Sequence, residues 1–205
     1  GNSKELPGDY RYVDANGDGI IDDNDRMPLF WSGTPLIHYG FNLEASWKNF
    51  DIYALLQGAG MYTVQFSEVY AEVLWSKGAN TPAYFYDRWR KEDPYNPNSK
   101  WVAGKWPATR LIQDTGAMYK ESNIWRRDAS YLRLKTLELG YTLPDSILRK
   151  SGISNIRFYI NGYNLLTFCD SFVKAFDLEK VEGSYSAGMN YPLTKSFNIG
   201  FTANF

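Results

Sequence analysis

The sequence predicts an all-β fold of antiparallel strands, and three observations support this prediction. Aromatic residues make up 17% of the 205 residues, and 17 glycines accompany them. Several segments alternate apolar and polar side chains with a period of two, which is the pattern of strands with one apolar and one solvated face. The links between these segments are alternately long and short. We therefore expect a set of antiparallel strands joined by very unequal connections.

Six segments are predicted to be strands. The clearest is the last, in which Phe197, Ile199 and Phe201 alternate with polar residues. Two others are joined by a tight turn at Lys48 and Asn49, so they should form a hairpin. The predicted strands cover residues 8–13, 41–47, 50–58, 130–144, 155–164 and 196–205.

The segment 131–144 changes phase in its middle. Leu132 and Leu134 share one parity, whereas Leu137 and Leu139 share the other. An extra residue in the strand near Thr136, a β-bulge, would bring both sets to one face. An apolar patch on the solvated face is the alternative, and the alternation itself does not choose between them.

The strand faces fit two classes of protein, a soluble β-sandwich and a transmembrane barrel. A sandwich buries the apolar faces in one core, whereas a barrel turns them to lipid and lines its lumen with polar groups. The links cover residues 14–35, 48–49, 62–130, 144–155 and 166–195, and those at one end are consistently longer. Long loops on one side and short turns on the other are typical of outer-membrane barrels. The links therefore favour a barrel, with the sandwich as the alternative.

In such a barrel, strand parity assigns side chains to the lipid or to the lumen. The residues expected to face lipid are Phe41, Leu43, Ile52, Phe158, Ile160, Ile199 and Phe201. Those expected to face the lumen are Asn42, Glu44, Arg157, Tyr159 and Asn198.

A calcium site is predicted in the loop DANGDGIIDDND, residues 14–25. Calcium loops of the EF-hand type take oxygen ligands from positions 1, 3, 5, 7, 9 and 12, with glycine at position 6. Gly19 supplies the glycine, and Ile20 and Ile21 are expected to pack inward. An Asx-and-glycine turn without metal is the alternative. The expected ligands are Asp14, Asn16, Asp18, the carbonyl of Ile20, Asp22 and Asp25.

The long link 62–130 is rich in aromatic residues. Such rings suit sugar faces and protein anchors, but they can equally form the small core of a folded loop. The candidates for contact with substrate or with a lid protein are Trp75, Tyr84, Tyr86, Trp89, Trp101 and Trp106.

Other functional classes find little support in the sequence. The formal net charge is −1, which gives no reason to expect a nucleic-acid partner. His38 is the only histidine and Cys169 the only cysteine, so no histidine-based triad, zinc cluster or internal disulfide can be assembled from this chain. We expect a protein that is not an enzyme.

Six pieces of the sequence, in order, resemble the SusC/RagA family of TonB-dependent outer-membrane transporters of Bacteroidetes. They include the calcium-type loop with its following arginine, and they end in a terminal phenylalanine. The pieces are GDYRYVDANGDGIIDDNDR (8–26), TPLIHYGFNLEASWKNFD (34–51), DRWRKEDPYNPNSKWVAGKWPATRL (87–111), WRRDASYLRLKTLELGYTLP (125–144), IRFYINGYNLLTF (156–168) and YPLTKSFNIGFTANF (191–205).

This resemblance implies both a fold and a function. Transporters of this family are 22-stranded barrels filled by an amino-terminal plug. Residues 1–205 would then be the carboxy-terminal barrel segment, with about six strands and without the plug. The family imports glycans or peptides across the cell outer membrane, together with a SusD-like surface lipoprotein and driven by TonB. The expected partners are therefore that lipoprotein, TonB through the plug, the rest of the barrel, the substrate and the lipid bilayer.

Overall fold

The structure is a computed structural model that describes residues 6–66, 81–109, 122–149, 152–175, 177–179 and 193–205. These residues belong to two units, each of which is described by itself. The first, the loop unit, lies within residues 1–30 and 65–126. The second, the sheet unit, lies within residues 31–64, 127–182 and 188–205.

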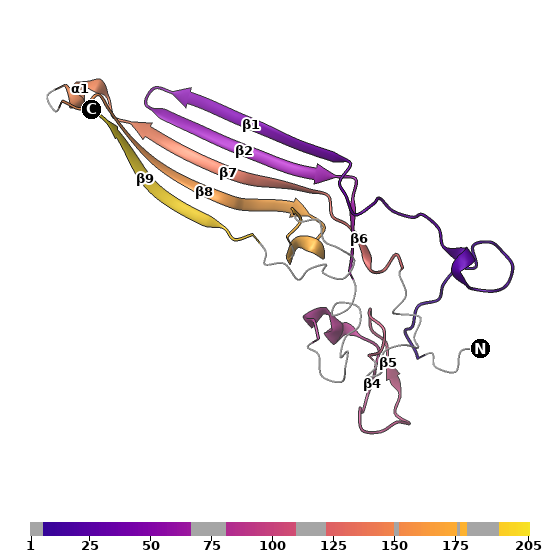
Figure 1. The fold of residues 1–205 in the computed structure, drawn as a ribbon. Helices are drawn as coiled ribbons and strands as arrows, with labels where there is room; N and C mark the ends of the chain where they lie inside the picture. The colour runs from indigo at the N-terminus through magenta and orange to yellow at the C-terminus, as the bar shows by residue number, and fades with distance from the viewer. Residues whose placement is uncertain (1–5, 67–80, 110–121, 150–151, 176, 180–192) are drawn as a thin grey trace. The chain divides into compact units, whose positions relative to one another are not determined.

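Five long antiparallel strands form the sheet unit (Figure 1). Their order is β1-β2-β7-β8-β9, so each strand pairs with its neighbour in the sequence of long strands. Their bounds are β1 Ile37–Trp47, β2 Phe50–Gly60, β7 Tyr131–Thr142, β8 Asn155–Cys169 and β9 Ser196–Asn204. This meander confirms the prediction of an all-β antiparallel fold.

The remaining elements are short. Strand β3 (Thr63–Gln65) pairs with β6 (Arg126–Asp128), and β4 (Arg90–Lys91) pairs with β5 (Trp101–Val102). The helical turns are η1 (Asp23–Asp25), η4 (Ala83–Asp87), α1 (Asp145–Leu148) and η6 (Val173–Ala175). In the part of the chain that the structure describes, no helix is long and apolar enough to cross a membrane.

Two-residue and twelve-residue connections alternate with much longer ones along the sheet. Lys48 adopts a φ of 55° in the tight turn between β1 and β2, and Asn49 Nδ2 donates to the Thr142 carbonyl at 2.8 Å, which ties this turn to β7. The helical turn α1 lies in the connection from β7 to β8, at the same end of the sheet (Figure 1). The long connections, 61–130 and 170–195, both leave from the opposite end.

The prediction of a strand at residues 8–13 is wrong, because the structure has no strand there. Residues 6–9 form a turn, in which Asp9 N donates to the Leu6 carbonyl at 3.1 Å and Leu6 N donates to Asp9 Oδ2 at 2.8 Å. Gly8 has a φ of +88°, which does not fit an extended strand. The alternation of Tyr10 and Tyr12 was therefore a misleading signal, because period two alone does not supply a neighbouring strand to pair with.

A β-bulge explains the phase change in the segment 131–144. Thr136 is opposite Leu55 and Leu134 is opposite Leu56, so Lys135 has no register partner on β2. The register with β8 also shifts between Leu134 and Thr136. The extra residue brings Leu132 and Leu134 to the same face as Leu137 and Leu139, and the alternative of a separate apolar patch is not needed.

Candidate functional site

Hydrogen bonds to its own backbone close the predicted calcium loop. Asp14 accepts from Gly17 N at 2.7 Å and from Gly19 N at 2.8 Å. Asp25 Oδ1 accepts from Ala15 N at 2.8 Å, and Asp25 Oδ2 accepts from Asp22 N at the same distance. The first and last predicted ligands are thus brought to one end of the loop.

The middle ligands of the loop make short local bonds. Asn16 Oδ1 accepts from Asp18 N at 2.9 Å, and Asp18 Oδ1 accepts from Ile20 N at 2.8 Å. Asp22 caps η1 by accepting from Asn24 N at 2.7 Å. Gly19 has a φ of +81°, as the turn at position 6 of such a loop requires. Ile20 is 63% exposed and Ile21 57%, so the expectation that they pack inward is wrong.

The loop supplies carboxylate, amide and carbonyl oxygens, which are the donors that calcium takes. Among the described residues, no three His, Cys, Asp or Glu side chains are gathered as a metal-binding group. Each carboxylate oxygen has further lone pairs beside those that accept the backbone N–H groups, so the donor chemistry remains suitable for a hard cation. The Asp25 pKa is lowered, mainly because its carboxylate accepts the backbone N–H of Asp22.

The aromatic residues of the loop unit form a small core. Phe85 and Trp125 are fully buried and Trp106 is 5% exposed. The Trp106 and Trp125 rings stack at 5.5 Å, and the Tyr84 ring lies 4.8 Å from that of Trp106. This packing occupies the faces of the Trp106 ring that a ligand would need.

The other described candidate aromatics differ in their surroundings and exposure. The Trp89 ring lies so close to Gly8 that a Cβ there would overlap the indole. Trp101 is half-buried, with Lys91 Nζ 4.8 Å above its ring. Tyr86 is 84% exposed and is free to meet a partner. Trp75 lies outside the described residues.

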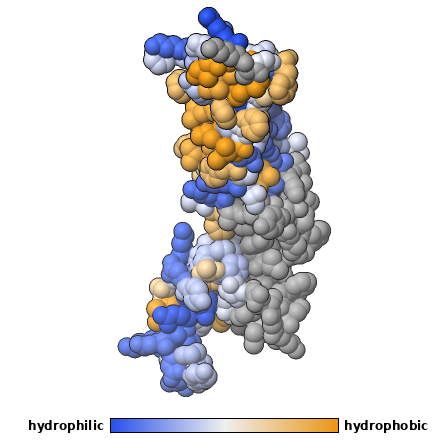
Figure 2. All heavy atoms as spheres, turned by 90° about the vertical axis from the view of Figure 1, so that its left-hand side faces the viewer, coloured by the Kyte–Doolittle hydropathy of each residue, from blue (hydrophilic) through white to orange (hydrophobic). Residues whose placement is uncertain are grey.

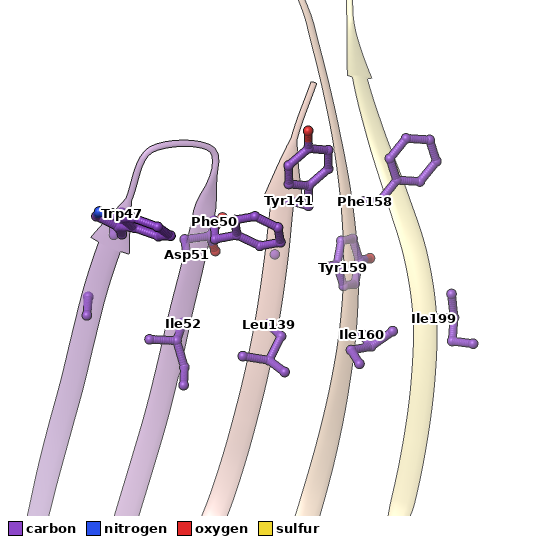
Figure 3. A pocket seen from close by; sticks show the side chains of 13 residues that line it. Trp47, Phe50, Asp51, Ile52, Leu139, Tyr141, Phe158, Tyr159, Ile160 and Ile199 are labelled. Atoms are coloured by element: carbon purple, nitrogen blue, oxygen red, sulfur yellow. The ribbon is translucent and has the colours of Figure 1, made fainter. Parts of the chain in front are cut away.

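One face of the five-stranded sheet, which we call the apolar face, is covered with hydrophobic side chains. Residues opposite one another in register share a face, so the register defines rows across the sheet. One row is Ala45, Ile52, Leu139, Ile160 and Ile199; a second is Trp47, Phe50, Tyr141, Phe158 and Phe201. Figure 3 shows members of both rows on neighbouring strands, and all residues of the two rows except Phe201 line a shallow hollow of about 450 Å³.

These apolar side chains are exposed to an unusual degree for a folded sheet. Phe41 and Leu43 are each 59% exposed, and Ile199 is 87% exposed. Figure 2 shows apolar side chains gathered on the end of the sheet that carries the β1–β2 turn and α1. A contiguous apolar surface of this kind marks contact with another apolar phase or partner.

The opposite face, which we call the polar face, carries a network of ion pairs and hydrogen bonds. Arg157 on β8 pairs with Asp51 on β2 and, at 2.7 Å, with Glu138 on β7. Asn161 Nδ2 donates to Glu138 Oε2 at 3.1 Å, and Asn198 Nδ2 donates to Asn161 Oδ1 at 2.9 Å. The network therefore links four adjacent strands from side to side.

A second cluster on the polar face includes Glu179, a residue that strand alternation does not predict. Arg133 and Lys135 of β7 both pair with Glu179, which lies in the connection after β8. The connection has no periodic pattern, so nothing in the sequence pointed to Glu179. Only the fold brings it to β7.

In sequence, the chain is similar to TonB-dependent receptors. TonB-dependent receptor P3 of Formosa agariphila is 34% identical over 165 residues, which are 80% of this chain and 15% of the receptor. TonB-dependent receptor P26 of the same organism is 30% identical over 221 residues, covering 98% of this chain and 20% of the receptor. The chain thus spans a fifth or less of these relatives. No family model matches it.

Solved structures agree with this relationship. The RagAB peptide importer in the 'open-open' state matches with a TM-score of 0.60 and 26% identity, over 85% of this chain and 18% of that one. The same importer in the 'closed-closed' state matches with a TM-score of 0.64 over 96% of this chain and 20% of that one; at 24% identity this match shows the fold alone. The sequence relatives and the shared strand architecture together show that this chain is a partial member of the TonB-dependent transporter family, of the SusC/RagA type.

Proposed function

We propose that this chain is the carboxy-terminal part of the barrel wall of an outer-membrane nutrient importer. One observation carries the proposal: the sheet has one face of exposed apolar side chains, and its opposite face carries ion pairs that join β2, β7 and β8. A transmembrane barrel requires this division, because its outer side chains meet hydrocarbon and its inner side chains meet water. In the secreted β-sandwich that is the alternative, the apolar face would be buried against a second sheet.

Uptake by such an importer is energised by TonB, and the importer works together with a surface lipoprotein of the SusD type. The substrate is an oligosaccharide or a peptide. The family relationship supports this proposal, and the name of the RagAB peptide importer adds support for a peptide. The exposed ring of Tyr86 is the described candidate for contact with the lipoprotein or the substrate.

The test is made with the full-length protein in its native cells. Membranes are fractionated, and uptake of labelled oligosaccharides and labelled peptides is measured with and without TonB. We expect extraction only with detergent, and TonB-dependent uptake of one of the two substrate classes. Recovery of the protein in the aqueous fraction would favour the sandwich and overturn the proposal.

We also propose that residues 14–25 bind one calcium ion. The support is the ligand register of the loop, the turn at Gly19 and the closure of the loop by Asp14 and Asp25. The ion would lie about 2.3–2.6 Å from its oxygen ligands and stiffen the loop for docking of the lid.

Calorimetric titration of the detergent-solubilised importer with calcium tests this site. Asp18→Asn removes charge from a predicted ligand and should weaken binding. Asp23→Asn is the matched control, because Asp23 is not a predicted ligand and pairs with Arg26 on the surface. Equal binding by the wild type and the Asp18→Asn variant would exclude the proposed site.

A further inference from the structure

Two short described pieces of the connection after β8, residues 173–175 and 177–179, lie against the sheet. Val173 in η6 is fully buried, and η6 packs against β8. Leu178 is 6% exposed, and its carbonyl accepts the Tyr62 hydroxyl at 2.8 Å. Burial also raises the pKa of Tyr62, so this phenol stays protonated and keeps donating. Residues 173–175 and 177–179 are therefore held against the sheet, and we call them the return segment.

Glu179 fastens the return segment to β7. Its carboxylate accepts from Lys135 Nζ at 2.6 and 2.8 Å and also pairs with Arg133. Arg133 is only 4% exposed, and its Nε donates to Thr167 Oγ1 on β8 at 3.0 Å. Arg133 is therefore held in place by β8 as well as by Glu179, whereas Lys135 adds a second cation from the same strand, β7.

The bulge at Lys135 makes this double pairing possible. In a regular strand the residue before Thr136 would point to the apolar face, because Thr136 lies on the polar face opposite Leu55 and Tyr163. The extra residue instead leaves Arg133 and Lys135 together on the polar face. One carboxylate from a connecting segment thus pairs with two cations of β7.

We propose that the return segment is an ionic latch, in which Glu179 holds it against the lumen wall and narrows the substrate path. This inference rests on the proposed function, because it takes the polar face as the lumen side. The latch differs from the Arg157 network, whose partners Asp51 and Glu138 all lie on strands. Glu179 can leave its cations without unpairing any strand of the sheet. When it does, the return segment lifts and the path widens at the end where the long connections lie.

The test uses Cys169 as a natural reporter. This residue ends β8, the strand against which η6 packs, and it is half-buried. The full-length importer is labelled in intact cells with a membrane-impermeant maleimide, and the rate is corrected with a Cys169→Ser variant. Release of charge-assisted hydrogen bonds shifts an open–closed equilibrium by about tenfold or more, so Glu179→Gln should raise the Cys169 labelling rate by about that factor.

The matched control is Glu44→Gln, which makes the same change at an exposed residue of the polar face on β1. It should leave the labelling rate unchanged. Lys135→Gln keeps the return segment intact and loosens only one of the two pairings, so it should give a smaller increase. It also serves as the second variant if Glu179→Gln does not fold, as judged by heat-modifiable mobility.

A second readout is the entry of a large hydrophilic antibiotic into these cells. Glu179→Gln should increase entry and Glu44→Gln should not. A folded Glu179→Gln variant with wild-type labelling, or with faster labelling and unchanged entry, would overturn the latch. If the wild type shows no TonB-dependent uptake, that result counts against the proposed function and not against the latch. Failure of the latch and failure of the proposed function can therefore be told apart.

Discussion

At the scale of single residues, Gly140 shows how a missing side chain organises the polar face. It lies on β7 opposite Asp51 of β2 and Tyr159 of β8, and the side chains of Asp51 and Arg157 form their ion pair directly over it. A Cβ at this position would overlap both the guanidinium and the carboxylate. Arg157 can reach across β7 to Asp51 because Gly140 has no side chain between them.

Gly140→Ala should therefore destabilise the folded full-length protein. Displacing the ion pair or straining β7 costs about 1–3 kcal/mol, as for other overpacked sites. Denaturant titration of the full-length protein, followed by its heat-modifiable mobility, measures this cost. Gly40→Ala on β1 is the control, because a Cβ there meets its nearest neighbour, the Leu56 carbonyl, at an ordinary 3.6 Å. Equal stability of the two variants would contradict the role given to Gly140.

Asp25 gives a second prediction at this scale, one that depends on pH. Its pKa is lowered, mainly by the Asp22 N–H and further by those of Ala15 and Asn16. A lowered folded pKa means that the contribution of Asp25 to loop closure is complete above the usual aspartate pKa of about 3.9 and is lost as the pH falls through the folded value. Hydrogen exchange at Ala15 and Asn16, corrected for intrinsic rates, should accelerate in this acidic range. Asp25→Asn should abolish the pH dependence and Asp23→Asn should keep it; a dependence that survives Asp25→Asn would assign it to another group.

At the scale of strands, the sequence predicts regular segments well and their irregularities poorly. The alternation in 41–47, 50–56 and 196–205 is enough to predict these strands and their two faces, because each residue there follows one parity. The tight turn at residues 48–49 also fixes the register of the hairpin. The phase change in β7 could be noticed but not interpreted, since a bulge is defined by the partners on β2 and β8. Glu179 could not be predicted at all, because its role depends on a connection folding back.

The two faces of β8 should respond differently to a charge. Ile160 lies on the apolar face and Asn161 on the polar face, one residue further along. If the apolar face meets lipid, Ile160→Arg should cost roughly 2–4 kcal/mol near the bilayer midplane, and Asn161→Arg much less. Folding titrations of the full-length protein into lipid vesicles measure both. Equal costs on the two faces would remove the barrel interpretation.

At the scale of the whole molecule, the sheet has two open edges. Strand β1 pairs only with β2, and β9 pairs only with β8, among the described strands. Each edge carries a row of backbone groups that need partners, and in hydrocarbon an unsatisfied group costs several kcal/mol. The sheet therefore needs further strands beside β1 and β9 before it can span a membrane.

Residues 1–205 refolded alone in detergent should accordingly aggregate. They should give no heat-resistant monomer, whereas the full-length importer treated in the same way should give one. Light scattering and mobility with and without boiling distinguish the two outcomes. A monodisperse monomer that folds cooperatively without detergent would show that the edges and the apolar face are satisfied within this chain.

The bulge at Lys135 also has a practical consequence for labelling or redesigning this sheet. Counting odd and even positions from Tyr141 back along β7 gives the correct face of the sheet as far as Thr136 and the wrong face for Leu134 and Leu132. A cysteine scan along β7 should therefore show its accessible positions switch from even to odd numbers on passing Lys135 toward Tyr131. On the Tyr131 side of the bulge, a probe, a cross-linker or a designed charge that is placed by odd and even numbering from Tyr141 would therefore lie on the opposite face of the sheet from the one intended.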